Sequence, residues 1–259
     1  MSEPKKVSDR FIQMGARNEM AAFGIVLGLC VYALTPGWTT ADPVEIAASS
    51  SFSSSYIDRG ETLALANNET EIQIGKSISD IDFTAGVAMR TPIGSDRSAF
   101  DKELGFTVGL GFEDSISRLD VSASYLSFPN SDEPPSVELA AELSLAQSFG
   151  PNLAVFYDLR SDVRGAEIAM TQTIDHRLTD FELLARAGFV DTPDQDYSYI
   201  GLEGGIRLYQ SDSSAVTAFL SGAVADEDTL VTAVRNDRRP NGRSEGWALG
   251  LRWTTSGLF

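Results

Sequence analysis

Charged side chains occupy alternate positions in several segments of the chain, a spacing that would let them contact solutes or form ion pairs along one face. Side chains two residues apart share one face of a β-strand. Carboxylates and guanidinium groups on one such face can orient solutes in a water-filled lumen, or they can fill a closed interior with ion pairs. The residues predicted to line such a lumen are Arg90, Asp158, Arg160, Glu167, Glu182, Arg186, Glu203, Arg207 and Arg252.

The residue types on which many enzymes depend are nearly absent from this sequence. The chain has one His and one Cys in 259 residues. A Ser–His or Asp–His pair would therefore depend on His176 alone. We interpret His176, which follows Asp175, as a solvated residue of a short turn. The sequence thus predicts no catalytic residue, no metal site and no cofactor, and the chain is not expected to be an enzyme.

The overall charge excludes a further class of partner. Lys and Arg total 20, whereas Asp and Glu total 37, which gives a formal net charge of -17. Binding to nucleic acid requires a clustered basic surface that neutralises phosphates. We therefore expect no nucleic-acid partner.

The N-terminal residues have the order of a secretory signal. Residues 1–20 are polar and basic, an apolar run follows from Ala21 to Leu34, and small residues precede Asp42. This order predicts a signal peptide over residues 1–41, with cleavage after Ala41. The apolar run is shorter than the roughly 20 residues that a membrane-spanning helix needs. Export would remove Cys30, so the mature chain of residues 42–259 fits the envelope of a Gram-negative bacterium.

Beyond residue 42 the dominant pattern is alternation with a period of two, which is typical of strands. At the C-terminus, for example, Trp247, Leu249 and Leu251 alternate with small or polar residues. The pattern predicts twelve strands over residues 43–56, 68–78, 80–90, 102–112, 116–128, 135–148, 152–160, 164–175, 179–190, 197–210, 214–226 and 243–259.

The connections between these segments alternate between short turns and mostly longer loops. The longer ones are 57–67, 91–101, 129–134, 161–163, 191–196 and 227–242. Short turns at one rim and long loops at the other are typical of outer-membrane barrels. We therefore predict an all-β fold, a closed antiparallel up-and-down transmembrane β-barrel of about twelve strands spanning residues 42–259. The alternative is a soluble β-sandwich, whose strands also alternate.

Two stretches resemble known bacterial proteins. The last strand, with Trp253 and a terminal Phe259 on one parity, resembles the C-terminal assembly signal of bacterial outer-membrane barrels. That resemblance implies recognition by the barrel-assembly machinery. The segment from Ser55 to Gly60 and the run Phe156-Tyr157-Asp158 resemble TorF-type porins of proteobacteria, although the long N-terminal region and the loop lengths differ from that family. Membership would imply a porin-like barrel.

The function expected from these patterns is a porin-like channel in the bacterial outer membrane for passive diffusion of small hydrophilic solutes. The alternative is a structural or adhesive barrel with a plugged lumen that acts through its external loops. Expected partners are outer-membrane lipid, lipopolysaccharide, the assembly machinery and the solutes themselves. We expect Arg186, Arg207 and Arg252 to attract anions, opposed by Glu182 and Glu203 on the same face. Loop 227–242, which mixes acidic and basic residues, could fold inward as a constriction or contact anionic headgroups.

Overall fold

The computed structural model describes residues 43–98, 102–129, 134–146, 150–174, 179–193, 196–226 and 245–258. Thirteen strands run through these ranges. They are β1 (Glu45–Ser53), β2 (Tyr56–Asp58), β3 (Glu61–Ile78), β4 (Ile81–Ser98), β5 (Glu103–Glu113), β6 (Ser117–Ser127), β7 (Ser136–Leu145), β8 (Pro151–Asp158), β9 (Val163–Ile174), β10 (Phe181–Asp191), β11 (Asp196–Gln210), β12 (Ser214–Ala225) and β13 (Glu245–Leu258).

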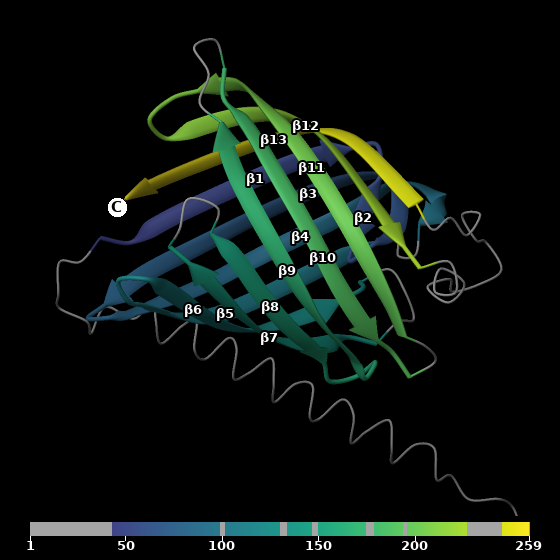
Figure 1. Ribbon diagram of the computed structural model, residues 1–259, viewed down its shortest axis with the longest axis horizontal. Coiled ribbons are helices and arrows are strands. Elements are labelled where there is room, and N and C mark those ends of the chain that lie inside the picture. Colours follow the sequence, from purple (N-terminus) through teal and green to yellow (C-terminus); the bar gives the residue numbers. More distant parts are fainter. Residues whose placement is uncertain are drawn as a thin grey trace, which may run out of the picture. The chain divides into compact units, whose positions relative to one another are not determined.

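Twelve of these strands form a closed wall (Figure 1). Each strand from β3 to β13 pairs antiparallel with the next, and β1 joins the two ends because it pairs with both β13 and β3. The short β2 pairs only with β3 and is not one of the strands that make up this ring. Closure pairs each of the twelve described wall strands on both sides, which is a requirement for strands that cross lipid. The predicted twelve-stranded antiparallel barrel is confirmed.

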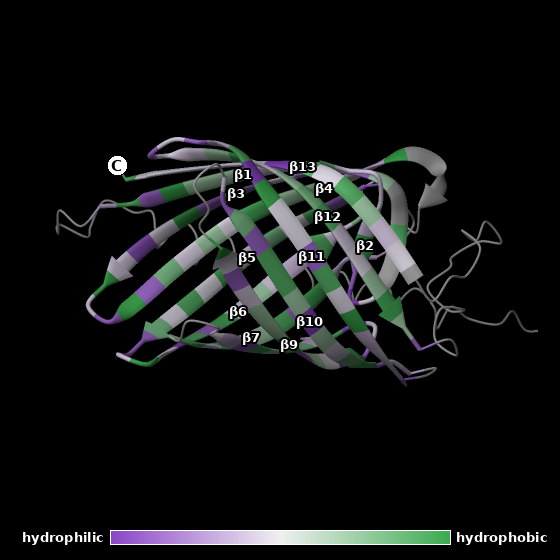
Figure 2. Ribbon diagram, turned by 45° about the horizontal axis from the view of Figure 1, so that its top comes forward, coloured by the Kyte–Doolittle hydropathy of each residue, from purple (hydrophilic) through white to green (hydrophobic). Residues whose placement is uncertain are grey.

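The outward face of the wall is apolar, as the alternation predicts. Trp247, Leu249 and Leu251 on β13 are 65%, 63% and 51% exposed, and Leu202 on β11 is 63% exposed. Figure 2 shows the same alternation of hydrophobic and hydrophilic residues along the tilted strands. A belt of exposed aliphatic and aromatic side chains suits contact with lipid, whereas the opposite parity faces inward. Within the described ranges, no helix has the length and apolar character needed to cross a membrane.

The two rims of the barrel differ in their connections. At one rim, called here the turn end, short links such as residues 79–80, 114–116 and 211–213 join neighbouring strands, and β1 begins and β13 ends there. These turns satisfy their own backbone groups, since Asp114 Oδ1 accepts hydrogen bonds from the N–H groups of Ile116 and Ser117, both at 2.8 Å. The opposite rim, called the loop end, carries residues 54–60 and 159–162.

The boundaries of three predicted strands need correction. The strands expected over 68–78 and 80–90 continue to Glu61 and Ser98, because β3 and β4 satisfy each other's backbone groups across Asn67 and Pro92, residues that normally mark turns. A register shift near Ala66 accommodates the extension. The strand expected over 43–56 instead ends at Ser53, and the chain departs from the wall after Ser54, whose N–H still donates to the Leu249 carbonyl oxygen at 2.9 Å.

Several predictions fall on residues outside the described ranges. They are the signal peptide over 1–41, the placement of His176, the inward folding of loop 227–242 and the position of Phe259. They remain predictions.

Candidate functional site

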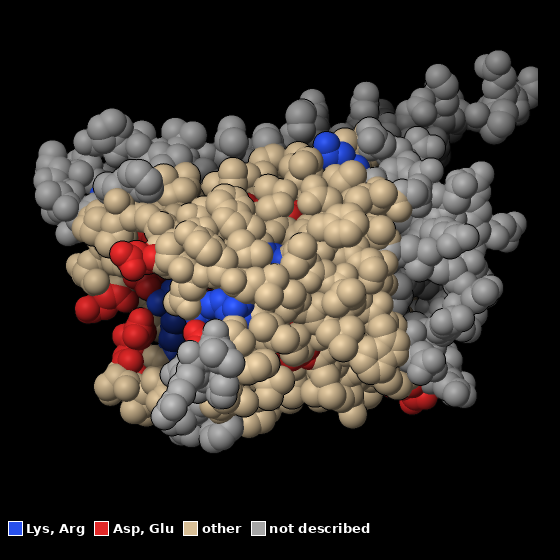
Figure 3. Space-filling view, turned by 90° about the horizontal axis from the view of Figure 1, so that it is seen from above, with Lys and Arg blue, Asp and Glu red and all other residues tan. Residues whose placement is uncertain are grey.

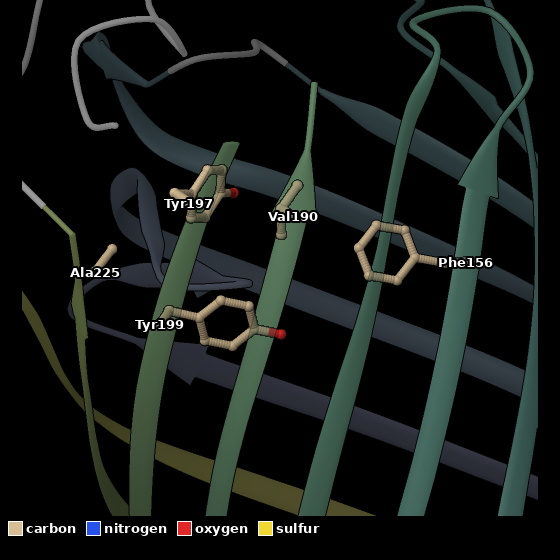
Figure 4. Close-up of a cluster of buried hydrophobic side chains, with 5 residues drawn as sticks. All are labelled: Phe156, Val190, Tyr197, Tyr199 and Ala225. Atoms are coloured by element: carbon tan, nitrogen blue, oxygen red, sulfur yellow. The ribbon is translucent and has the colours of Figure 1, made fainter. Parts of the chain in front are cut away.

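A cluster of buried apolar side chains lies inside the barrel near the loop end. Phe156, Val190, Tyr197, Tyr199 and Ala225 project from β8, β10, β11 and β12, and Val190 and Tyr199 are each only 2% exposed (Figure 4). All five occupy the parity that also carries the inward-facing polar residues of their strands. The loop-end half of the interior is therefore packed and largely dry along this side.

Residues 54–60, called here the inward segment, pack against this cluster from the other side of the lumen. The chain leaves the wall after Ser54, and the Ser53 Oγ donates a hydrogen bond of 2.7 Å to the carbonyl oxygen of Ser55. Arg59 then reaches β7 and β8. Its Nη2 lies 2.8 Å from the carboxylate of Glu138, and its guanidinium carbon lies 3.5 Å from the ring centroid of Phe156.

These contacts require the inward segment to cross the interior. In the ring of twelve wall strands, β8 lies directly opposite β1. A twelve-stranded wall with strands about 4.8 Å apart and tilted by about 40° is roughly 24 Å across. The chain from Ser53 to Arg59 spans up to about 20 Å when extended, and the arginine side chain covers the remainder. The inward segment thus narrows the lumen at this level.

The charge of Arg59 is stabilised where its side chain meets β7 and β8. Burial disfavours the charged guanidinium, but Asp58 and Glu138 outweigh that cost and hold the pKa of Arg59 above its ordinary value. The face of Phe156 adds a cation–π contact. Arg59 therefore acts as an anchor that holds the inward segment across the barrel.

Gly60 allows the inward segment to approach β11 closely. Its φ of +84° is a conformation that residues with a Cβ rarely adopt, and a Cβ there would overlap the Cβ and Cγ atoms of Tyr199. Tyr199 in turn donates a hydrogen bond of 2.5 Å from its hydroxyl to Glu167 on β9. Both Gly60 and Tyr199 are thus fixed where the segment meets the wall.

A second arginine, Arg90, contacts the inward segment at Tyr56. Arg90 on β4 lies with its guanidinium carbon 5.5 Å from the ring centroid of Tyr56. The same guanidinium binds Glu69 at 2.7 Å and also pairs with Glu103. Tyr56 is therefore packed against an arginine that two wall carboxylates already neutralise.

The turn-end half of the interior contains two cavities. One, of about 410 Å³, is lined by residues of β1, β3, β11, β12 and β13, among them Ser49, Glu71 and Arg207. The other, of about 580 Å³, is lined by residues of β1, β3, β4, β6 and β13, including Asp82 and Arg118. Figure 3 shows Lys and Arg side chains recessed in a hollow at this end, with Asp and Glu side chains around it. Space large enough for water molecules, lined by polar residues, thus lies on the turn-end side of the packed cluster.

Arginines in and beside these cavities are bound by carboxylates. Arg118 binds Asp82 at 2.6 Å and Asp120 at 2.8 Å, with Glu113 more distant at 3.4 Å. Their shared parity places all of them on the inner face of β4, β5 and β6.

Two further arginines follow the same pattern on neighbouring strands. Arg207 on β11 binds Asp180 at 3.1 Å and also pairs with Glu182. Arg252 on β13 binds Glu203 at 3.0 Å and lies 4.8 Å from the ring centroid of Phe219.

The structure places the predicted lumen residues in three groups. Arg90, Glu182, Glu203, Arg207 and Arg252 lie in the ion pairs just described, and Glu167 binds Tyr199. Arg186 occupies the inward parity of β10 and has no ion-pair partner among the described residues. Gly201 opposite it leaves room for its stem, since a Cβ there would lie 2.8 Å from the Arg186 Cγ.

Asp158 and Arg160 differ from the rest because β8 ends at Asp158. Its Oδ1 accepts hydrogen bonds from the backbone N–H groups of Arg160 at 2.8 Å and Ser161 at 2.9 Å. Arg160 therefore lies in the exposed turn at the loop end, outside the strand wall, and donates to the carbonyl oxygen of Pro135 at 3.2 Å. The placement of Arg160 in the wall needs correction on this ground.

Glu167, Arg186 and Glu203 all face inward on neighbouring strands, but they do not lie directly opposite one another. Arg186 pairs with Ala169 and Gly201, so that each glutamate is offset from it by two residues along its strand. The stagger of a barrel makes such diagonal offsets normal. Glu203 instead pairs with Arg252 on β13.

Inward-facing carboxylates outnumber inward-facing arginines on the described strands. Five arginines occupy the inward parity: Arg90, Arg118, Arg186, Arg207 and Arg252. Thirteen carboxylates share that parity, of which Glu69, Asp82, Glu103, Glu113, Asp120, Glu138, Glu182 and Glu203 lie in ion pairs, whereas Glu45, Glu71, Glu142, Asp158 and Glu167 have no ion pair among the described residues. Among described side chains, no group of three or more His, Cys, Asp or Glu is arranged to hold a metal ion.

The inward segment is the functional feature that the sequence prediction missed. Residues 57–67 were expected to form a long external loop. The sequence signals at this point are the aromatic Tyr56, three residues after the end of β1, and the pair Arg59-Gly60. The partners of these residues, Glu138 and Phe156, lie about 80 or more positions later in the chain, so local pattern cannot reveal the contact.

Comparison with known proteins supports the fold. No family model and no curated protein sequence matches the chain. Among solved structures, an outer membrane channel from Pseudomonas putida F1 matches with 13% identity and a TM-score of 0.51, covering 87% of this chain and 100% of the other. The NanC porin matches with 10% identity and a TM-score of 0.51, covering 81% of this chain and 98% of the other.

The fold is that of a bacterial outer-membrane β-barrel. The likeness to both solved structures extends over most of this chain and nearly all of theirs. At such low identities it concerns the barrel architecture and does not single out the TorF-type porins.

Proposed function

We propose that this protein is a channel of the bacterial outer membrane through which small hydrophilic solutes diffuse passively. The observation that carries the proposal is the pair of polar cavities in the turn-end half of the lumen. A closed barrel surrounds them, and its apolar outer face suits lipid. The solved structures it resembles include an outer membrane channel and a porin.

In the proposed channel, the inward segment sets the narrowest point. Arg59, Glu138 and Phe156 hold it across the loop-end half, and Gly60 lets it pack on Tyr199. Solutes from the loop end would pass beside this segment and enter the wider cavities beyond it. The account requires no catalytic residue and no cofactor.

The test is swelling of proteoliposomes in iso-osmotic solutions of neutral sugars. We expect liposomes that contain the folded protein to swell faster in a monosaccharide than in a trisaccharide, because the inward segment leaves a narrow passage. Heat-denatured protein serves as the control. Swelling no faster than in protein-free liposomes would contradict passive diffusion.

A second candidate function is a structural or adhesive barrel that acts through its external loops. The observation that favours it is the packed loop-end half, where Val190 and Tyr199 are each 2% exposed. If the inward segment closed the lumen fully, the barrel would conduct nothing. The swelling assay separates the two candidates directly.

Export, membrane partners and assembly are part of the same proposal. The signal peptide over residues 1–41 would direct export, and lipid, lipopolysaccharide and the assembly machinery would be partners in the outer membrane. Trp253 faces outward on β13, 43% exposed, and its Nε1 donates a hydrogen bond of 2.8 Å to the Ser214 hydroxyl. An outward aromatic residue on the last strand is accessible to a recognising partner, as the proposed assembly signal of Trp253 and Phe259 needs.

A further inference from the structure

The arginines of the lumen present little positive charge to a passing solute. Arg118 is bound by three carboxylates, and Arg90 and Arg207 by two each. A guanidinium that shares its charge among two or three carboxylates belongs to a group with net negative charge. Each of these three clusters therefore adds negative charge to the lumen.

Other interior carboxylates form no ion pair with any described residue. Glu71 is exposed in the cavity at the turn end, and Glu142 accepts a hydrogen bond from the neutral amide of Asn152. Glu167 likewise has a neutral donor, the Tyr199 hydroxyl. Against these stands Arg186, the inward arginine that has no ion-pair partner among the described residues.

The inward segment does not reverse this balance at the narrowest point. Its one cation, Arg59, is neutralised by Glu138, and Asp58 precedes it with the opposite charge. On β3, β4 and β5, where the segment contacts Arg90, the two carboxylates of Glu69 and Glu103 outnumber that one arginine. The excess of carboxylates thus extends from the constriction to the turn-end cavities.

We infer that the lumen passes small cationic hydrophilic solutes in preference to anionic ones. The inference rests on the proposed channel function and names its solute class. Carboxylates that line a pore are a recognised basis of cation preference, and low-dielectric walls concentrate their field within the passage. This inference departs from the expectation that lumen arginines attract anions, because Arg207 and Arg252 are bound by carboxylates and only Arg186 has no ion-pair partner among the described residues.

The test is the reversal potential of the full-length mature protein in planar bilayers under a KCl gradient. The reversal potential of the wild type is expected to shift from zero toward the equilibrium potential of K⁺. Glu71→Gln and Glu142→Gln keep side-chain shape and remove one charge each. Each should lower the permeability ratio of K⁺ to Cl⁻ by about twofold, the effect expected of one charge several ångström from an ion in water. Arg186→Gln should raise the ratio.

The matched control is Asp162→Asn. Asp162 lies in the exposed turn at the loop end with a φ of 55°, which Asn tolerates, and its Oδ1 accepts from the Tyr157 hydroxyl. Its loss of one charge outside the lumen should leave the ratio unchanged. A reversal potential shifted toward the equilibrium potential of Cl⁻ overturns the inference and leaves the channel function standing. So does a permeability ratio of K⁺ to Cl⁻ that Glu71→Gln does not alter. If neither the wild type nor Arg59→Ala carries current, the channel function fails and the inference with it.

Discussion

Replacement of Arg59 by Ala is expected to raise the single-channel conductance of the folded protein. The change removes the ion pair with Glu138 and the contact with Phe156 that hold the inward segment across the lumen. A hydrogen bond to a charged group contributes about 1.5–3 kcal/mol, and a cation–π contact adds about 0.5–2 kcal/mol. Loss of roughly 2 kcal/mol would shift the population of the crossed state by about thirtyfold.

The control for this experiment is Arg164→Ala. Arg164 also pairs with a carboxylate near the loop end, Asp191 at 2.7 Å, but its side chain is 67% exposed and lies on the outward parity of β9. Its removal should leave conductance at the wild-type value. Equal conductance in Arg59→Ala and Arg164→Ala channels would show that Arg59 does not restrict the passage.

Gly60→Ala is expected to displace the inward segment and to expose it to trypsin. A Cβ at position 60 would overlap Tyr199, and the φ of +84° would be strained in any residue that has a Cβ. A left-handed conformation alone costs an L-residue about 1–2 kcal/mol. Trypsin should then cleave after Arg59 in detergent-folded protein, a bond that the packed segment protects in the wild type.

Gly204→Ala is the matched control on β11. A Cβ at Gly204 would meet no atom closer than 3.8 Å, so the substitution should be tolerated. The cleavage pattern is read by mass spectrometry on protein that retains its strand-dominated circular dichroism. Equal resistance of Gly60→Ala and Gly204→Ala to trypsin would mean that Gly60 does not position the segment.

The wall of the barrel could be predicted from sequence because its signals are local. Alternation along β13 places Trp247 outward and Arg252 inward without reference to any other strand. Turn residues such as Asp114 and Ser211 likewise act within their own short links. Strand existence, parity and the rhythm of connections therefore follow from neighbouring residues alone.

The interior could not be predicted in the same way, because its contacts depend on register and on distant segments. The partner of Arg252 is Glu203, 49 positions away, and Arg59 finds Glu138 79 positions away. Alternation tells which side chains face inward, but not which of them meet. Which arginines remain available to a solute follows only once these pairs are known, since an arginine bound by carboxylates attracts an anion less than an unpaired one.

The most direct test of the account compares two inward serines on β1. Ser49 lines a turn-end cavity, whereas Ser53 is 7% exposed beside the inward segment. Each is replaced by Cys in a chain that lacks Cys30, and the folded protein is treated with a water-soluble thiol reagent. The account predicts rapid modification of Ser49→Cys and at least about tenfold slower modification of Ser53→Cys, since the reagent must reach a buried thiol through local opening. Equal rates at the two positions would contradict an interior that is open at the turn end and narrowed at the loop end.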